Sequence, residues 1–247
     1  MKIFISGISS GIGKALAIRL IKRGHEVWGL ARRKELLHSL KEKIGSDNLH
    51  ISVCDVQDID TSKKIIQDMR ANEFIPDIVV LCAGVRSEDA HPLSGLSFEK
   101  VQLMSRVNIE GGLFWVAEFM PDFMRRHSGI FIGISSTAAY RPSKNHVTYG
   151  ATKAALSMAF RGLRLNYPSS GVRFSTIHFG PVATEMWEGK ENFLTPSAEK
   201  AAIFIESVFK KKSGSYFFPA PTTMFMRLSL ILPDSFFSLL AHLLKKD

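Results

Sequence analysis

The sequence has only two cysteines among its 247 residues, Cys54 and Cys82. Two cysteines cannot build the disulfide framework that stabilises many small secreted proteins. Neither lies close in sequence to a second cysteine or to paired histidines, so the spacing of a metal site is also missing. We therefore expect no bound metal, and we expect the reducing environment of the cytoplasm.

Long apolar runs are also missing. The apolar residues at the start of the chain are few and are followed by glycines, so we expect no signal peptide. An extension rich in Phe, Leu and Met, residues 219–247, contains Arg227, Pro233 and Asp234, and no run in it reaches the roughly 20 residues of a membrane span. The extension is expected either to cover the core or a subunit partner, or to lie on a membrane surface as an amphipathic segment.

The net charge of +9 is not concentrated in one place. Basic pairs and triplets are scattered, and no aromatic platform or nucleic-acid motif accompanies them. Nucleic acid is therefore not an expected partner. The charge fits solvated surfaces together with a site for a phosphorylated cofactor.

Short apolar runs alternate with helical patterns along the whole chain, with no repeat or low-complexity linker. Near-continuous apolar strands are typical of a parallel sheet buried on both faces. The alternation predicts an α/β protein, a doubly wound parallel sheet of the Rossmann type with helices on both faces, built as one domain over residues 1–247. The expected strands are residues 2–6, 27–30, 50–53, 78–82, 130–134, 172–178 and 216–218.

The first of these strands is followed by the sequence SGISSGIG, Ser6 to Gly13. A nucleophile elbow with Ser9 needs earlier strands to carry it, but only one precedes this loop. A Walker A loop fails on its spacing, since position 8 is Ile and position 15 is Ala. A loop that opens a helix with glycines at 7, 11 and 13 suits a dinucleotide, whose pyrophosphate approaches bare backbone at the helix N-terminus.

The second strand ends in Ala31, where dinucleotide folds that use NAD place a carboxylate for the ribose 2′-hydroxyl. The next two residues are Arg32 and Arg33. A guanidinium suits the 2′-phosphate of NADP, and Arg32 can pair with it through two hydrogen bonds. The alternative is that both arginines are solvent-exposed residues at the start of a helix and bind no ligand. We expect NADP(H).

Tyr149 and Lys153 are spaced to share one face of a helix. A lysine ammonium would stabilise the phenolate and lower the tyrosine pKa from about 10, which makes Tyr149 a candidate general acid or base. Tyr140 and Lys144 have the same spacing, but Pro142 disfavours a helix between them. Ser135 and Ser136 end a strand upstream, where ligands of such sheets bind.

With these residues in place, the chain resembles a short-chain dehydrogenase/reductase of the single-domain, Rossmann-type branch, over residues 2 to 220. The resemblance implies a catalytic tetrad of Asn108, Ser136, Tyr149 and Lys153, in which Asn108 orders a water that relays protons to Lys153. It also implies a homodimer or homotetramer formed through helices near residues 108–124 and 149–165.

The resemblance further implies a set of cofactor contacts along the carboxyl ends of the strands. Arg32 and Arg33 join this set as the residues for the 2′-phosphate. The implied contacts are the loop glycines Gly7, Gly11 and Gly13, with Ser9, Ser10 and Ile12 beside the phosphates, Asp55 and Val56 at the adenine, Ala83 and Gly84 along the adenosine ribose, Tyr149 and Lys153 at the nicotinamide ribose, and Val182 and Thr184 at the carboxamide.

Two positions depart from the family pattern. Cys82 stands where the family has an asparagine that braces the sheet, so we expect local loosening there, and we expect the thiol to be buried and inert rather than reactive. Phe179 replaces a proline and is expected to crowd the nicotinamide end. Beyond it, residues 185–195 should form a lid with apolar side chains, and Thr195 should cap the next helix.

These features predict an NADP(H)-dependent reductase of a small carbonyl compound, or the matching alcohol dehydrogenase, with Tyr149 as the acid/base. The apolar lid favours a hydrophobic ketone, although the same side chains could simply pack the lid against the body. The alternatives are a non-catalytic NADP-binding sensor or interaction protein on the same fold, and a serine hydrolase acting through Ser9.

Overall fold

The computed structural model describes residues 1–141, 145–187 and 191–233. Seven parallel strands form one sheet in the order β3-β2-β1-β4-β7-β8-β9, as expected for a doubly wound fold. Their bounds are β1 Lys2–Ser6, β2 Glu26–Ala31, β3 Leu49–Val53, β4 Ile78–Leu81, β7 Gly129–Ser136, β8 Val172–Phe179 and β9 Gly214–Phe218. The predicted α/β fold class and the seven strands are confirmed.

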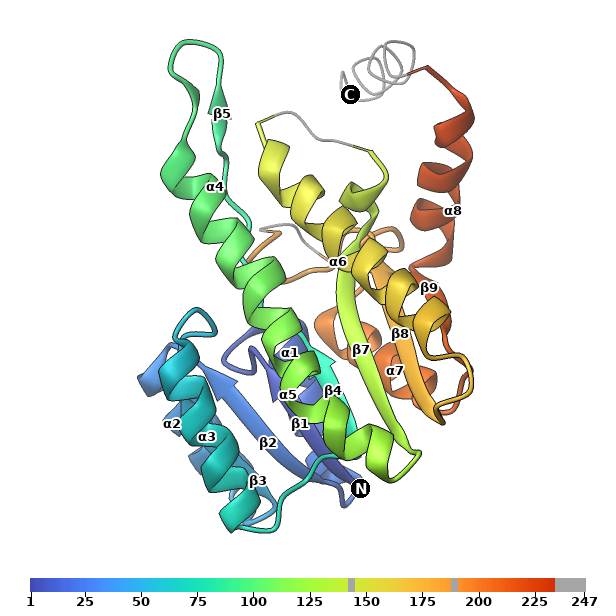
Figure 1. Cartoon of the computed structure of the whole chain (residues 1–247). Helices are drawn as coiled ribbons and strands as arrows, with labels where there is room; N and C mark the ends of the chain where they lie inside the picture. The colour runs from blue at the N-terminus through green and yellow to red at the C-terminus, as the bar shows by residue number, and fades with distance from the viewer. Residues whose placement is uncertain (142–144, 188–190, 234–247) are drawn as a thin grey trace.

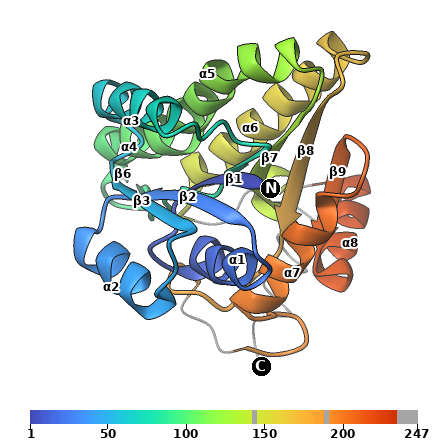
Figure 2. The ribbon, with the colours of Figure 1, turned by 90° about the horizontal axis from the view of Figure 1, so that it is seen from below.

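Helices cover both faces of this sheet, as Figure 2 shows. On one face lie α1, α2 and α7, and on the other lie α3, α4, α5 and α6. A π-helical turn, Arg106–Glu110, joins α4 to α5. The helix bounds are α1 Gly11–Lys22, α2 Lys34–Ile44, α3 Ile59–Ala71, α4 Phe98–Ser105, α5 Gly111–Arg125, α6 Val147–Asn166, α7 Ala198–Val208 and α8 Ala220–Leu228.

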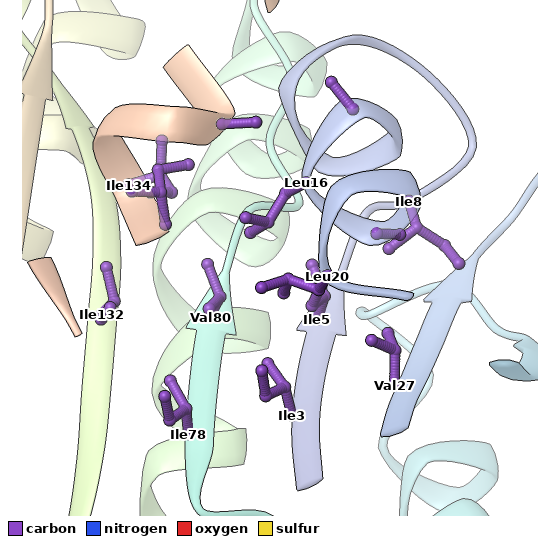
Figure 3. Packing of buried hydrophobic residues seen from close by; sticks show 14 of the residues in the cluster. Ile3, Ile5, Ile8, Leu16, Leu20, Val27, Ile78, Val80, Ile132 and Ile134 are labelled. Atoms are coloured by element: carbon purple, nitrogen blue, oxygen red, sulfur yellow. The ribbon is translucent and has the colours of Figure 1, made fainter. Parts of the chain in front are cut away.

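The central strands are mostly apolar because both of their faces are buried. On the α1 and α7 side, Ile3 and Ile5 of β1 pack beside Ile78 and Val80 of β4 under Leu16 (Figure 3). The opposite face is aromatic, with Trp115, Phe119, Phe131 and other rings in contact. A central strand therefore needs apolar residues at successive positions, which is why the sequence reads as apolar runs.

Two elements differ from expectation. A two-stranded antiparallel hairpin, β5 Ala90–His91 with β6 Gly95–Leu96, projects beyond the carboxyl end of the sheet. Helix α7 is capped by Ser197, whose hydroxyl accepts a hydrogen bond from the Lys200 amide, so the predicted cap at Thr195 is wrong. The chain stays extended through this point because the Pro196 carbonyl accepts a hydrogen bond from the Ala183 amide.

Candidate functional site

The order of the strands brings two loops together at the carboxyl end of the sheet. Strands β1 and β4 are neighbours in the sheet, and the chain leaves β1 toward one face of the sheet and β4 toward the other. Doubly wound sheets bind their ligands at the carboxyl ends of two such strands. The Ser6 hydroxyl accepts hydrogen bonds of 3.1 Å from the amides of Cys82 and Ala83. The glycine loop after β1 is thereby fastened to the loop after β4.

Two positions of the glycine loop are packed too closely to accept a side chain. A Cβ on Gly7 would lie 2.7 Å from the Ala83 Cα, and Gly7 has a positive φ of 82°. A Cβ on Gly13 would lie 2.1 Å from the Gly7 carbonyl oxygen. Helix α1 begins at Gly11, and its cap residue Ser10 makes no side-chain capping bond. Its first amides are therefore suited to an anion, as the sequence predicts.

Both arginines after β2 lie near this loop, but they have different partners. The Arg33 guanidinium donates hydrogen bonds to the hydroxyls of Ser9 and Ser10 and pairs with Glu185 at 3.0 Å. Arg32 instead pairs with Asp55 at 3.4 Å. The structure thus brings Arg33 against the glycine loop, whereas the sequence argument had favoured Arg32 as the residue that pairs with the 2′-phosphate.

The other residues predicted to contact the cofactor have different neighbours. Asp55 accepts hydrogen bonds from Gln57, while the Val56 side chain packs against Gly111 on the aromatic face. Thr184 follows β8 and approaches Gly11, since a Cβ there would lie 3.4 Å from the Thr184 methyl group. Val182, like the loop residue Ile8, is buried in the core.

Asn108 lies in the π-helical turn before α5, a distortion that is frequent at functional sites. Its amide oxygen accepts a 2.8 Å hydrogen bond from the Val85 amide, and its nitrogen donates to the Val85 carbonyl and to the Thr152 hydroxyl. Asn108 therefore ties the loop after β4 to helix α6, which carries Tyr149 and Lys153.

Tyr149 and Ser136 are close enough for their side chains to hydrogen-bond. Burial raises the pKa of the Tyr149 hydroxyl, although the Ser136 hydrogen bond and the charge of Arg86 act to lower it. Lys153 is not among these influences, so the expected lowering of the Tyr149 pKa by Lys153 is absent here. A tyrosine with a raised pKa is protonated at neutral pH.

Lys153 is nearly inaccessible to solvent, and its amine lies 5.8 Å from the centre of the Tyr149 ring. The amine donates a 2.9 Å hydrogen bond to the Ile134 carbonyl. Burial lowers the pKa of Lys153 to about 8, because a charged amine loses its hydration in the protein interior. Gly84 leaves room beside this amine, since a Cβ there would lie 3.3 Å from it.

Neither departure from the family pattern disturbs these contacts. Burial raises the pKa of the Cys82 thiol to about 11, with Lys153 acting in the opposite direction, so the thiol stays protonated. Phe179 is buried in the core and meets the Phe218 ring edge-on. Crowding of the nicotinamide end by Phe179 was expected, but the ring points into the core instead.

The other tyrosine with a lysine four residues later lies elsewhere. Tyr140 follows the 3₁₀ turn Thr137–Ala139, and its hydroxyl lies 3.4 Å from His178 Nε2. Lys144 lies outside the described residues. Tyr149 is the tyrosine that shares helix α6 with a lysine one turn later.

Two residues at the site had no signal in the sequence. The carboxylate of Asp89 accepts hydrogen bonds from the amides of Val147 and Thr148, at the start of the helix that carries Tyr149. Arg86 lies over the ring of Trp187, with the guanidinium 5.6 Å from the ring centre. Both contacts join residues more than 50 positions apart, which no local pattern reveals.

Among the described residues, no group of three or more His, Cys, Asp or Glu side chains could hold a metal ion. Across those same residues, no helix is both long and apolar enough to cross a bilayer.

Comparison with known proteins identifies relatives of this chain. Serine 3-dehydrogenase of Rhizobium radiobacter is 35% identical over 183 residues, covering 74% of this chain and 72% of that protein. NADP-dependent 3-hydroxy acid dehydrogenase YdfG of Escherichia coli K12 is 31% identical over 182 residues, 74% of this chain and 73% of its own. An uncharacterized oxidoreductase of Myxococcus xanthus is 28% identical over 246 residues, 98% of this chain and 96% of its own.

Solved structures agree with these relatives. The closed form of serine dehydrogenase complexed with NADP+ superimposes with a TM-score of 0.80 at 26% identity, covering 88% of this chain and 94% of that one. Residues 1–194 match the family model described as short chain dehydrogenase. The chain is an oxidoreductase that belongs to the short-chain dehydrogenase/reductase family.

Proposed function

We propose that the protein is an NADP(H)-dependent oxidoreductase that transfers hydride between nicotinamide and a carbonyl compound or secondary alcohol. One observation carries the proposal: Tyr149, Ser136 and Lys153 meet at the end of the sheet where the glycine loop leaves backbone open to a phosphate. The NADP-dependent dehydrogenase of Escherichia coli and the serine dehydrogenase complexed with NADP+ support the choice of cofactor.

The residues at the glycine loop fit this cofactor. The bare backbone at Gly7 and Gly13 and the uncapped start of α1 suit the pyrophosphate. Arg33 is poised for the 2′-phosphate, with Arg32 beside it, and Ala31 supplies no carboxylate for the 2′-hydroxyl of NAD. When bound, the nicotinamide supplies or accepts the hydride.

The protein's own residues would donate the proton and bind the carbonyl oxygen. Tyr149, protonated at neutral pH, would donate its hydroxyl proton to the oxygen in the reducing direction, and Ser136 would hold that oxygen. Lys153, with a pKa near 8, would carry a positive charge at neutral pH beside the tyrosine and the nicotinamide ribose. Asn108 would then order the water relay while holding α6 against the loop after β4.

A non-catalytic sensor on this fold would usually have lost one or more residues of the tetrad, whereas all four are present in this sequence. The hydrolase alternative needs Ser9 as a free nucleophile, but the Ser9 hydroxyl accepts hydrogen bonds from Arg33, and within the described part of the chain it has no hydrogen bond to a histidine.

The substrate we propose is a hydrophobic ketone. Met186, Trp187 and Phe193 of the expected lid leave large parts of their side chains exposed, as an apolar cover would. The middle of the lid, residues 188–190, lies outside the described residues.

Arg86 favours a second candidate, a carbonyl compound that also bears a carboxylate. Its charge reaches the Tyr149 hydroxyl, and its guanidinium lies on the lid residue Trp187. Within the described residues it has no ion pair with a carboxylate of the protein. The relatives named for serine and 3-hydroxy acids fit this alternative.

For the oligomer, we propose the apolar groove of about 790 Å³ between α5 and α6 as the contact between copies. Leu113 and Met120 line one side of the groove, and Ala159 and Leu163 line the other.

The first prediction concerns Tyr149. Tyr149→Phe removes the proton donor but not the ring, so turnover with NADPH and a ketone should fall by at least about 100-fold while NADPH still binds. Tyr140→Phe is the matched control and should retain turnover. Turnover is measured from steady-state rates and NADPH binding from NADPH fluorescence. A Tyr149→Phe enzyme that keeps its turnover rate would show that Tyr149 is not the proton donor.

Arg86 can be tested by comparing two substrates. Arg86→Met should lower kcat/KM for a 3-hydroxy acid at least about 10-fold more than that for an alcohol without a carboxylate, because both share the effect of Arg86 on the Tyr149 pKa but only the former also loses a charge-assisted hydrogen bond. Arg86→Lys should restore part of the loss. An equal loss on both substrates would contradict a carboxylate-binding role.

The groove can be tested through Gly162, which lines it and would have no atom within 4 Å of an added Cβ. Gly162→Glu should therefore fold normally but place a charge in the contact, so sedimentation velocity should show dissociation into monomers. Gly162→Ala is the control and should keep the mass of the assembly. An oligomer that survives Gly162→Glu would rule out this face.

A further inference from the structure

Helix α6 begins without a side-chain cap from its own cap residue. In the part of the chain that the structure describes, His146 makes no side-chain capping bond to the first turn. The first four amides of a helix have no partner inside the helix and need one from elsewhere. Tyr149 is the third residue of α6, so a group that holds this first turn also holds Tyr149.

A carboxylate from a distant part of the chain supplies the cap. Asp89 is 2% exposed, and its two oxygens accept hydrogen bonds of 2.8 Å from the Val147 amide and 2.7 Å from the Thr148 amide. Burial acts to raise the pKa of Asp89, but the hydrogen bonds from Thr148 and Val147 lower it below the ordinary value, so the carboxylate is charged at neutral pH. This charge lies at the positive end of the helix dipole, where an anion is stabilised.

The backbone of Asp89 is held in place by the β5–β6 hairpin. The Asp89 carbonyl accepts a 2.8 Å hydrogen bond from the Ser97 amide, and the Asp89 amide donates a 2.9 Å hydrogen bond to the Asn145 carbonyl. The bond to Ser97 closes the base of the hairpin, in which Ala90 pairs with Leu96. The hairpin therefore keeps the Asp89 carboxylate against the start of α6.

A second contact ties the first turn of α6 to the turn that follows β7. A Cβ on Gly150 would lie 2.8 Å from the Ala138 carbonyl oxygen, so the two backbones touch. The Ser136 hydroxyl accepts a 3.1 Å hydrogen bond from the Ala138 amide, and the Ser136 and Tyr149 side chains hydrogen-bond to each other. A shift of the helix start would therefore change the contact between Tyr149 and Ser136.

We propose that Asp89 is a positioning residue for the reaction: its carboxylate holds the first turn of α6 so that the Tyr149 hydroxyl meets Ser136. This inference rests on the proposed function, in which Tyr149 donates the proton and Ser136 holds the carbonyl oxygen. Asp89 acts through the helix, since its carboxylate bonds to the first two residues of α6 and neither of them belongs to the tetrad.

The first test separates turnover from cofactor binding. Asp89→Ala removes both acceptors and should lower kcat for a ketone at least about 10-fold, because a misplacement of about 1 Å can cost that much or more in rate. The Kd of NADPH should stay within about 3-fold of the wild-type value, because the lost contact positions the proton donor rather than the cofactor. Asp89→Asn keeps one acceptor and the size of the side chain, so its kcat should lie between those of Asp89→Ala and the wild type.

The matched control is a carboxylate cap on another helix, Asp58→Ala. Asp58 accepts a 2.9 Å hydrogen bond from the Thr61 amide at the start of α3, which carries none of the tetrad residues. Both substitutions remove a cap and should lower the melting temperature, but Asp58→Ala should keep the wild-type kcat. Equal losses of kcat in the two variants would overturn the proposal, and so would an Asp89→Ala protein that keeps its kcat.

The second test does not depend on turnover. The chain has four tyrosines, so ¹³C labelling of tyrosine Cζ gives a simple NMR spectrum, in which the Tyr149 resonance is the one missing from Tyr149→Phe. This resonance responds to the hydrogen bond of the hydroxyl, so Asp89→Ala should move it in the same direction as Ser136→Ala does, and Asp58→Ala should leave it in place. A Tyr149 resonance unchanged in Asp89→Ala would overturn the positioning role. Lack of turnover in the wild type would instead overturn the proposed function, while a moved resonance would still support the hold of Asp89 on Tyr149.

Discussion

The site depends on the close approach of two backbone segments, the loop after β1 and the loop after β4. Gly7 lies against Ala83, Gly13 lies over the Gly7 carbonyl, and the Ser6 hydroxyl receives two amides of the second loop. A methyl group at Gly7 would push these two segments apart, and one at Gly13 would push the start of α1 away from the Gly7 carbonyl. The start of α1 and the residues after β4 can face one ligand only because this contact exists.

From this contact a chain of buried polar hydrogen bonds reaches helix α6, which carries Tyr149 and Lys153. Asn108 holds Val85 on one side and Thr152 on the other, and Lys153 donates to the Ile134 carbonyl. Below them, Ser135 and Ser157 both donate to the Lys153 carbonyl. Buried polar groups are costly unless they are paired, so this network fixes the positions of Tyr149 and Lys153 more strictly than apolar packing would.

The fold could be predicted from the sequence because its signals are local. Strands buried on both faces appear as apolar runs, and Gly7 and Gly13 mark the positions of the loop at which a side chain would clash. The short hairpin β5–β6 was missed, since two-residue strands leave no periodic pattern. The predicted cap at Thr195 failed because the contact of Ala183 with Pro196 keeps that segment extended, a tertiary effect.

The candidate site could be predicted in its residue types but not in its electrostatics. The spacing of Tyr149 and Lys153 predicts a shared helix, and the structure has one. The pKa of Tyr149 is instead governed by burial, Ser136 and Arg86, and burial lowers the pKa of Lys153 itself. Desolvation and partners distant in sequence decide such shifts, and neither can be read from spacing along the chain.

The most direct test of the account is titration of the purified protein with NADPH and with NADH, followed by fluorescence. The account predicts tighter binding of NADPH, and a loss of that preference in Arg33→Ala that exceeds the loss in Arg32→Ala, because Arg33 is the arginine on the phosphate loop. Equal or tighter binding of NADH would contradict the assignment of the 2′-phosphate site. Binding of neither cofactor would contradict the proposed function altogether.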